Sequence, residues 1–160
     1  MKIGEGLIIF VTGGASGLGL ATVRYLHGKG ATLAVADMQI EALQKLQSEL
    51  QTRILVMECD VSSEDDVKKC IDKTVATYGA LHVALPIAGV GWTMLTYSES
   101  RGPLNMEQFR KVIEINLYGS VHVAKYAAMA MSKNKPIGDK KEKGVIIFVS
   151  SVAAYEGQKG

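Results

Sequence analysis

A glycine-rich segment near the amino terminus has the residue types needed to bind a phosphate group. Residues 12–19 read TGGASGLG and directly follow the apolar run 7–11 (LIIFV). Glycine allows a tight turn there and lets backbone N–H groups at the start of a helix approach an anion. Glycine clusters also occur in turns for geometric reasons alone, but a position between strand and helix favours a pyrophosphate site. The candidate residues are Gly13, Gly17 and Gly19.

An aspartate supplies the second half of a dinucleotide site. Asp37 follows the apolar run 32–36 (TLAVA), twenty residues after Gly17. A carboxylate at that strand end can accept hydrogen bonds from an adenosine ribose and would repel a 2′-phosphate, so NAD(H) is favoured over NADP(H). The alternative is a solvated aspartate at the end of a strand. Asp60 and Val61, after the third apolar run, could similarly border the adenine ring.

Five short apolar runs must position these residues: 7–11, 32–36, 54–57 (ILVM), 81–87 (LHVALPI) and 145–149 (VIIFV). None of them alternates between apolar and polar residues, which is typical of a parallel sheet covered on both faces. Helical spacing lies between the runs, with one stripe formed by Leu18, Ala21, Tyr25 and Leu26 and the next by Leu43, Leu46 and Leu50. The alternation predicts an α/β fold, a Rossmann-type doubly wound parallel sheet of about five strands. We expect one dinucleotide-binding domain over residues 1–160.

Two later helices are also expected. Ser63 is a candidate N-cap, with Asp65 and Asp66 in the first turn, where carboxylates favour the helix dipole. The buried face of this helix is predicted to be Val67, Cys70, Ile71, Val75 and Tyr78. Residues 105–131 are predicted to form a long helix with a bend near Tyr118 and Gly119.

Composition excludes several classes of protein. The 160 residues carry 18 basic and 16 acidic side chains, a net charge of +2 that does not suggest a nucleic-acid surface. No apolar run reaches the roughly 18 residues that a membrane span needs, so we expect a soluble intracellular protein. His27, His82 and His122 lack ligand spacing, so no metal site is expected. Cys59 and Cys70 are expected to be small buried side chains rather than redox partners.

The chain resembles the short-chain dehydrogenase/reductase family over essentially its whole length. The matching motifs, in order, are TGGASGLG at 12–19, CDV at 59–61, AG at 88–89, EINLYG at 114–119 and SSVAA at 150–154. Within the family, GGASGLGLAT at 13–22, GVII at 144–147 and SVAAYEGQ at 151–158 are most similar to the 3-hydroxyacyl-CoA dehydrogenase type 2 branch, also called 17β-hydroxysteroid dehydrogenase type 10.

The resemblance implies a cofactor, a substrate class and an assembly. It implies an NAD(H)-dependent oxidoreductase that interconverts a secondary alcohol, of the 3-hydroxyacyl-CoA or hydroxysteroid type, and a ketone. Ser151 would hydrogen-bond the substrate oxygen and Asn116 would help order a proton-relay water. The cofactor contacts implied are Ser16, Leu18, Asp37, Asp60, Val61 and Ile87, beside Ala88 and Gly89 of the AG motif. A homo-oligomer, dimer or tetramer, formed through the long helices is expected by analogy, in the mitochondrion or cytoplasm.

The tyrosine and lysine of the family's chemistry do not match any pair in this sequence. Tyr155 and Lys159 have the required spacing of one helical turn, but Tyr155 follows Ser151 by only four residues. Gly157 between them also disfavours the helix that must hold both on one face. By family spacing the pair would fall shortly after Gly160, so we expect a chain truncated relative to the family.

Two departures from the family favour an alternative function. Pro86 replaces the usual asparagine before the AG motif, which removes a backbone donor and a side-chain amide. Phe148 stands where close relatives have an asparagine. The alternative is a non-catalytic Rossmann-fold binding or scaffold protein derived from such an enzyme. With five strands, the fifth is expected to leave apolar surface exposed along its flank.

Overall fold

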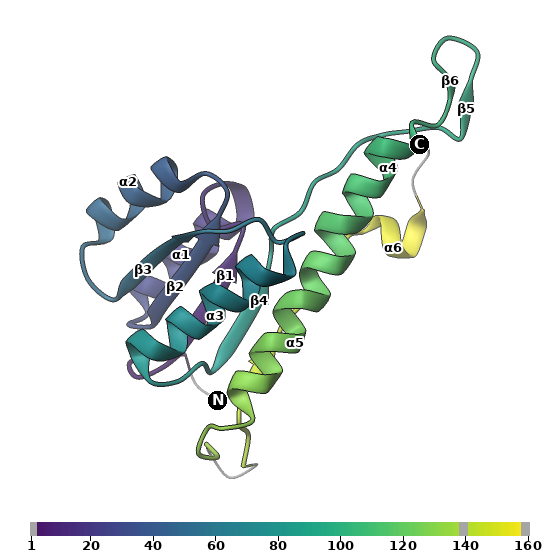
Figure 1. Ribbon diagram of the computed structural model, residues 1–160. Coiled ribbons are helices and arrows are strands. Elements are labelled where there is room, and N and C mark those ends of the chain that lie inside the picture. The colour runs from purple at the N-terminus through teal and green to yellow at the C-terminus, as the bar shows by residue number, and fades with distance from the viewer. Residues whose placement is uncertain (1–2, 138–140, 158–160) are drawn as a thin grey trace.

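A five-stranded parallel sheet forms the centre of the molecule, in the order β3-β2-β1-β4-β7. The computed structural model describes residues 3–137 and 141–157 (Figure 1). The strands are β1 (Ile8–Thr12), β2 (Thr32–Asp37), β3 (Ile54–Glu58), β4 (Val83–Pro86) and β7 (Val145–Ile146). The order runs outward from β1 in both directions, which is the doubly wound arrangement that the sequence predicts.

Helices cover both faces of the sheet (Figure 1). α1 (Gly17–Gly28) and α2 (Ile40–Leu50) cover one face, and α3 (Glu64–Tyr78) and α5 (Gly119–Met131) cover the other. α4 (Met106–Ile113) and the short α6 (Ala153–Glu156) extend past the sheet. Alternate side chains of β1 point to opposite faces, because successive residues of a strand do so. Ile9 and Val11 pack in one core with residues of α1 and α2, whereas Phe10 packs with residues of α3 and α5. The sheet is therefore covered on both faces, as the sequence predicts.

The third helix is confirmed at its start and on its buried face. The Ser63 hydroxyl accepts a hydrogen bond from the backbone N–H of Asp66 at 3.3 Å. Val67, Cys70 and Ile71 are buried, and Val75 and Tyr78 pack partly buried against the same core. The spacing on α2 is confirmed as well, with Leu43 and Leu46 buried.

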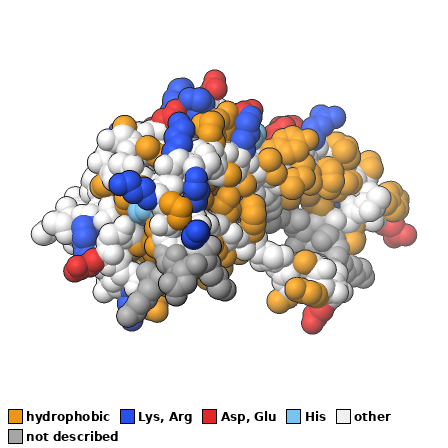
Figure 2. All heavy atoms as spheres, turned by 90° about the horizontal axis from the view of Figure 1, so that it is seen from below, with side chains coloured by type: hydrophobic (Ala, Val, Ile, Leu, Met, Phe, Trp, Pro, Cys, Tyr) orange, Lys and Arg blue, Asp and Glu red, His pale blue; other side chains and the backbone are white. Residues whose placement is uncertain are grey.

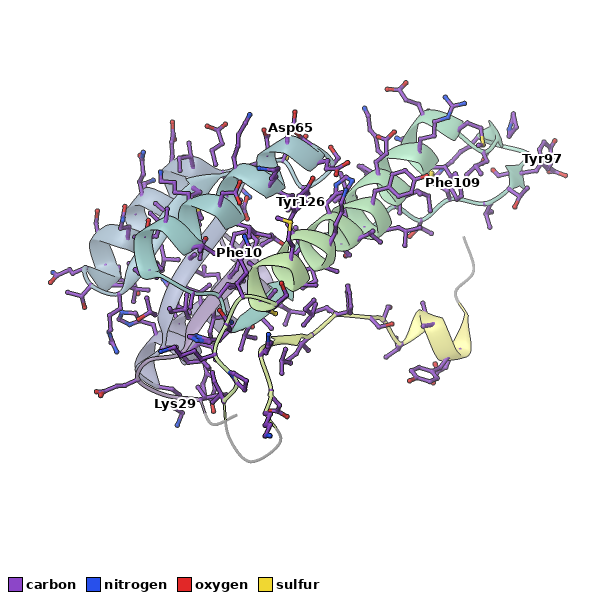
Figure 3. All side chains as sticks on the ribbon, turned by 60° about the horizontal axis from the view of Figure 1, so that its bottom comes forward. Phe10, Lys29, Asp65, Tyr97, Phe109 and Tyr126 are labelled. Carbon is purple, nitrogen blue, oxygen red and sulfur yellow. The ribbon has the colours of Figure 1, made fainter. Side chains whose placement is uncertain are left out.

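The long helix contains a wider turn next to the residues where the sequence predicts a bend. Between α4 and α5, residues Glu114–Tyr118 form a π-helical turn, η1. Such a turn inserts an extra residue into the helical ladder and shifts the faces on either side of it. Asn105 caps α4 by accepting from the N–H groups of Glu107 and Gln108. No residue of α4 is buried, and Figure 3 shows its Phe109 well away from Phe10 of the core.

The predicted stripe on α1 is wrong at three of its four positions, and only Leu26 is buried as expected. Leu18 is 72% exposed and Tyr25 60% exposed, and Ala21 is exposed too. The buried residues are Gly19, Val23 and Leu26. Glycine at position 19 lets α1 approach the loop before it so closely that this side of the helix must face the sheet.

The structure differs from the prediction in the length of β7 and in one additional hairpin. β7 pairs with β4 only over Val145 and Ile146, although the apolar run continues to residue 149. The expected exposed apolar flank is present, with Phe148 56% exposed between two similarly exposed neighbours. A hairpin that the sequence did not predict, β5 (Tyr97–Ser98) with β6 (Gly102–Pro103), lies beyond the start of α4. Within the described ranges, no helix is both long and apolar enough to cross a membrane.

Candidate functional site

A cleft of about 590 Å³ opens at the carboxyl ends of the central strands. It lies where β2 and β4 flank β1, the point at which the strand order reverses and where doubly wound proteins bind ligands. The residues expected to bind the cofactor all line it: Gly13, Ser16, Gly17, Leu18, Gly19, Asp37, Asp60, Val61, Ile87, Ala88 and Gly89. Segments from four strand ends thus meet around one cavity.

The glycine turn is built around a very close backbone approach. Gly13 has a φ of 72° and donates its N–H to the Ala36 carbonyl at 2.9 Å. A Cβ atom on Gly13 would lie 2.7 Å from the backbone nitrogen of Ala88, and one on Gly19 would collide with the Gly13 carbonyl oxygen. These two positions therefore require glycine, and together they bring the start of α1 to the edge of the cleft.

The amino terminus of α1 presents free N–H groups to the cleft. The Ser16 side chain makes no capping hydrogen bond, and the first turn contains no acidic residue. The start of α3 is the opposite case, since Ser63 caps it and three acidic residues occupy its first turn. Among the described residues, the first turn of α1 thus has neither a side-chain cap nor an acidic residue, which leaves the positive end of its dipole available to a phosphate.

Two carboxylates face the cleft from the ends of β2 and β3. Asp37 Oδ2 accepts a hydrogen bond from the Ala15 N–H and its Oδ1 accepts from the Gln39 N–H, both at 3.0 Å. Asp60 Oδ1 accepts from the N–H and hydroxyl of Ser62 at 2.9 and 2.7 Å. Among the described lining residues these are the charged groups, and none is a lysine or arginine.

The loop after β4 is held against the rest of the cleft by side chains. The Thr12 hydroxyl accepts a hydrogen bond from the Ala88 N–H at 3.4 Å. Asn116, in the π-helical turn, accepts from the Val90 N–H and donates to the Val90 carbonyl, both at 2.8 Å. Pro86 is the last residue of β4, opposite Thr12, and its side chain is buried. Asn116 thus positions the loop after β4 with both the oxygen and the nitrogen of its side-chain amide.

Ser151 does not lie on the cleft. It is exposed in the turn before α6, where its hydroxyl accepts a hydrogen bond from the Ala153 N–H at 3.2 Å. Val149, two residues earlier, does line the cleft. Tyr155 is 92% exposed and α6 ends at Glu156, before Gly157 with its φ of 70°. The helix that would align Tyr155 with a residue four positions later stops short, and Lys159 lies outside the described residues.

Sequence reasoning missed several lining residues: Met38, Gln39, Cys59, Val90, Ile115 and Val149. Most of them are direct sequence neighbours of predicted residues. They could have been found by including the residues on either side of each predicted position. The three histidines lie apart, and each bonds a separate backbone group: His27 at Thr52, His82 at Ile8 and His122 at Val61.

Comparison with known proteins identifies the family. The sequence model described as short chain dehydrogenase matches residues 7–160. Human 3-hydroxyacyl-CoA dehydrogenase type-2 is 36% identical over 157 residues, which cover 98% of this chain and 60% of the human protein. The chain thus spans about 60% of the length of the curated relatives it matches.

Solved structures agree with the sequence comparison. A crystal structure of 3-hydroxyacyl-CoA dehydrogenase type-2 from Mycobacterium avium superposes with a TM-score of 0.89 at 34% identity, covering 100% of this chain and 63% of that one. A 3-ketoacyl-(acyl-carrier-protein) reductase from Brucella melitensis, complexed with NADH, superposes with a TM-score of 0.84. It covers 97% of this chain and 61% of that one at 22% identity, so this likeness concerns the fold alone. The motifs, the sheet order and the family match agree, and the chain belongs to the short chain dehydrogenase family.

Proposed function

We propose that this chain is the dinucleotide-binding part of an NAD(H)-dependent oxidoreductase that interconverts a secondary alcohol and a ketone. The observation that supports this best is the cleft itself. The open helix terminus, the glycine turn and the Asp37 carboxylate, which lie apart in the sequence, border one cavity. Family membership favours the same chemistry.

The residues present fit a nicotinamide dinucleotide. The N–H groups at the start of α1 would bind the pyrophosphate, since neither a cap nor an acidic side chain competes for them. Asp37 would accept hydrogen bonds from the adenosine ribose. Because the described lining offers two carboxylates and no cation, a 2′-phosphate beside Asp37 would be repelled and would have no charged partner, which supports NAD(H) over NADP(H). When bound, the nicotinamide supplies the hydride acceptor or donor.

The proposed roles of residues toward the substrate follow from the resemblance to the short-chain dehydrogenase/reductase family. We assign Ser151, which lies in the exposed turn before α6 and not on the cleft, to hydrogen-bond the substrate oxygen. Asn116 is assigned to order a relay water, while the Asn116 side chain holds the loop at Val90. The proton-transferring tyrosine and its lysine would lie in the part of the relatives' length that this chain does not span. The names of the relatives favour a 3-hydroxyacyl-CoA substrate, with a hydroxysteroid as the other member of the class.

A homo-oligomer would be formed through the long helix. Its apolar side chains Phe109, Leu117, Val121 and Met129 are exposed at helical spacing. Figure 2 shows hydrophobic side chains gathered in a patch toward the right of the view, on the part of the molecule that extends past the sheet. A second copy that covered this stripe would remove it from water. The compartment, mitochondrial or cytoplasmic, stays a prediction.

Two measurements test the proposal separately. Titration of the chain with NADH, followed by nucleotide fluorescence, should show saturable binding that is stronger than binding of NADPH. Adding NAD⁺ and a 3-hydroxyacyl-CoA to the full-length protein should produce absorbance at the NADH band. Absence of binding would overturn the cofactor assignment, whereas binding without turnover of any secondary alcohol would overturn the enzymatic one.

A further inference from the structure

The two cysteines of the chain pack in one core cluster, although the sequence suggests two unrelated buried side chains. Cys59 directly follows β3 and is 3% exposed, and Cys70, in the second turn of α3, is 5% exposed. A hydrogen bond between the two thiols is the largest influence on the pKa of each. The Cys70 sulfur also approaches the carbonyl oxygen of Glu58, the residue before Cys59, at 3.6 Å. Both cysteines are unbonded thiols packed in the same core.

Each cysteine also borders a hollow that opens to solvent. Cys59 lines the large cleft between Asp60 and the loop after β4. Cys70 lines a separate hollow of about 320 Å³ between α2, β3 and α3, where Lys69 and Lys73 outnumber the single acidic residue, Glu58. A small molecule can therefore reach Cys70 without passing through the dinucleotide cleft. A positively charged, partly accessible surrounding is the setting in which cysteine thiols react.

The environments of the two thiols give them different acidities. The hydrogen bond from Cys59 lowers the pKa of Cys70, and Lys73 and Lys69 act in the same direction against burial and Asp66. The same hydrogen bond, followed by burial, raises the pKa of Cys59. Cys70 is thus the group that ionises first, and Cys59 is the neutral thiol beside it.

We propose that Cys59 and Cys70 form an oxidant-sensitive dithiol that hydroperoxides convert to an intramolecular disulfide. The Cys70 thiolate attacks one oxygen of hydrogen peroxide, the O–O bond breaks, and hydroxide leaves and takes up a proton to form water. Cys70 then carries a sulfenic acid. The Cys59 sulfur attacks the Cys70 sulfur, the S–S bond forms, the S–O bond breaks, and a second water leaves. Two thiols are oxidised and one peroxide is reduced.

The disulfide would tie the end of β3 to α3 across the cleft wall that contains Asp60 and Val61. A covalent link there restricts the segment between the two cysteines. The thiol chemistry does not depend on the proposed dehydrogenase function, because neither the dinucleotide nor the alcohol takes part in it.

Intact-mass spectrometry of the native chain, treated with graded hydrogen peroxide and then unfolded and alkylated, tests the proposal. Both thiols should be lost together, the mass should fall by two hydrogens, and dithiothreitol should restore it. The same chain in urea should form the disulfide more slowly, because unfolding separates the two sulfurs. Recovery of two free thiols from the native chain, or a disulfide between two chains, would overturn the proposal.

Two serine variants separate the roles of the thiols. In C59S, the sulfenic acid on Cys70 has no partner and should be captured by dimedone. In C70S, the thiol of Cys59 should react at least about tenfold more slowly than Cys70 does in C59S, because burial still keeps it neutral. Equal reaction of the two variants would exclude Cys70 as the first site. If either variant fails to fold, the intact-mass measurement on the wild-type chain still tests the proposal.

Discussion

Asp37 Oδ2 accepts a hydrogen bond at 3.0 Å from the backbone N–H of Ala15, in the middle of the glycine-rich loop. The residue at the end of β2 is thereby fixed to the segment that precedes α1. Oδ1 of the same carboxylate is held by the Gln39 N–H. These two hydrogen bonds orient Asp37 before a ligand binds, so that binding costs less conformational entropy.

Replacing Asp37 by asparagine should change cofactor preference. The neutral amide loses charge-assisted hydrogen bonds to the ribose, which contribute about 1.5–3 kcal/mol, so NADH affinity should fall on the order of tenfold or more. Repulsion of a 2′-phosphate is also lost, so NADPH should bind better relative to NADH. Nucleotide fluorescence titration measures both. The matched control is Glu41→Gln, an exposed acid on α2 outside the cleft; an equal loss in the control would contradict the assignment.

Gly13→Ala should disrupt the cleft and destabilise the fold. The new Cβ would lie 2.7 Å from the backbone of Ala88, and a φ of 72° strains any residue with a side chain. We expect a loss of about 3 kcal/mol in the free energy of unfolding, measured in urea, together with loss of NADH binding. Gly28→Ala is the control, since open space surrounds that position at the end of α1. Wild-type stability in Gly13→Ala would show that the loops can separate.

Asn116→Asp should loosen the loop after β4. An aspartate can still accept from the Val90 N–H but can no longer donate to the Val90 carbonyl, and its charge would face that carbonyl oxygen. We expect a loss on the order of 1–2 kcal/mol in the free energy of unfolding and faster hydrogen exchange of the Val90 amide. Ser120→Ala, which removes a bond to the Asn116 carbonyl instead, serves as comparison. Unchanged exchange at Val90 would mean that the loop is held by other contacts.

The success of sequence reasoning differs between elements for physical reasons. The cap at Ser63 and the face of α3 were predictable, because a helix that packs on a sheet must bury one apolar stripe. On α1 the same reasoning gave the wrong face. There the close contact of Gly19 with Gly13 sets the orientation, and Leu18 lies at the cleft instead of in the core.

The candidate site was predictable where it consists of strand ends, and less so elsewhere. Gly13 and Asp37 could be placed together because parallel strands end at one edge of the sheet. The double hydrogen bond of Asn116 to Val90 depends on the π-helical turn, which has no sequence signature of its own. The contact of Cys59 with Cys70 depends on how α3 packs against the end of β3, which spacing along the chain does not encode.

Stability should fall in mild acid because of His82. Its Nδ1 accepts a hydrogen bond from the Ile8 N–H at 3.1 Å, so the folded protein requires the neutral ring. Burial lowers the pKa of His82 below its usual 6.5. The unfolded chain therefore binds the proton more readily, and stability present above pH 6.5 should be lost as the pH falls below that value. Urea midpoints between pH 7.5 and about 5 measure the slope. His82→Asn, whose side-chain oxygen can accept the same bond, should show a shallower slope, and an equal slope would exclude His82 as the cause.

Val121→Lys should weaken self-association without unfolding the chain. Val121 is 51% exposed on α5, in the apolar stripe that continues from Phe109, so a lysine there needs no buried space. A second copy packed on this stripe would have to bury the new charge unpaired, which costs several kcal/mol. In sedimentation equilibrium, the wild type should therefore have a mass greater than that of one chain. The Val121→Lys variant should have a mass close to that of one chain. Tyr25→Lys makes the same kind of change at an exposed aromatic on α1, and its mass should remain that of the wild type. If Val121→Lys kept the wild-type mass while Tyr25→Lys lost it, the interface would lie on the α1 side instead.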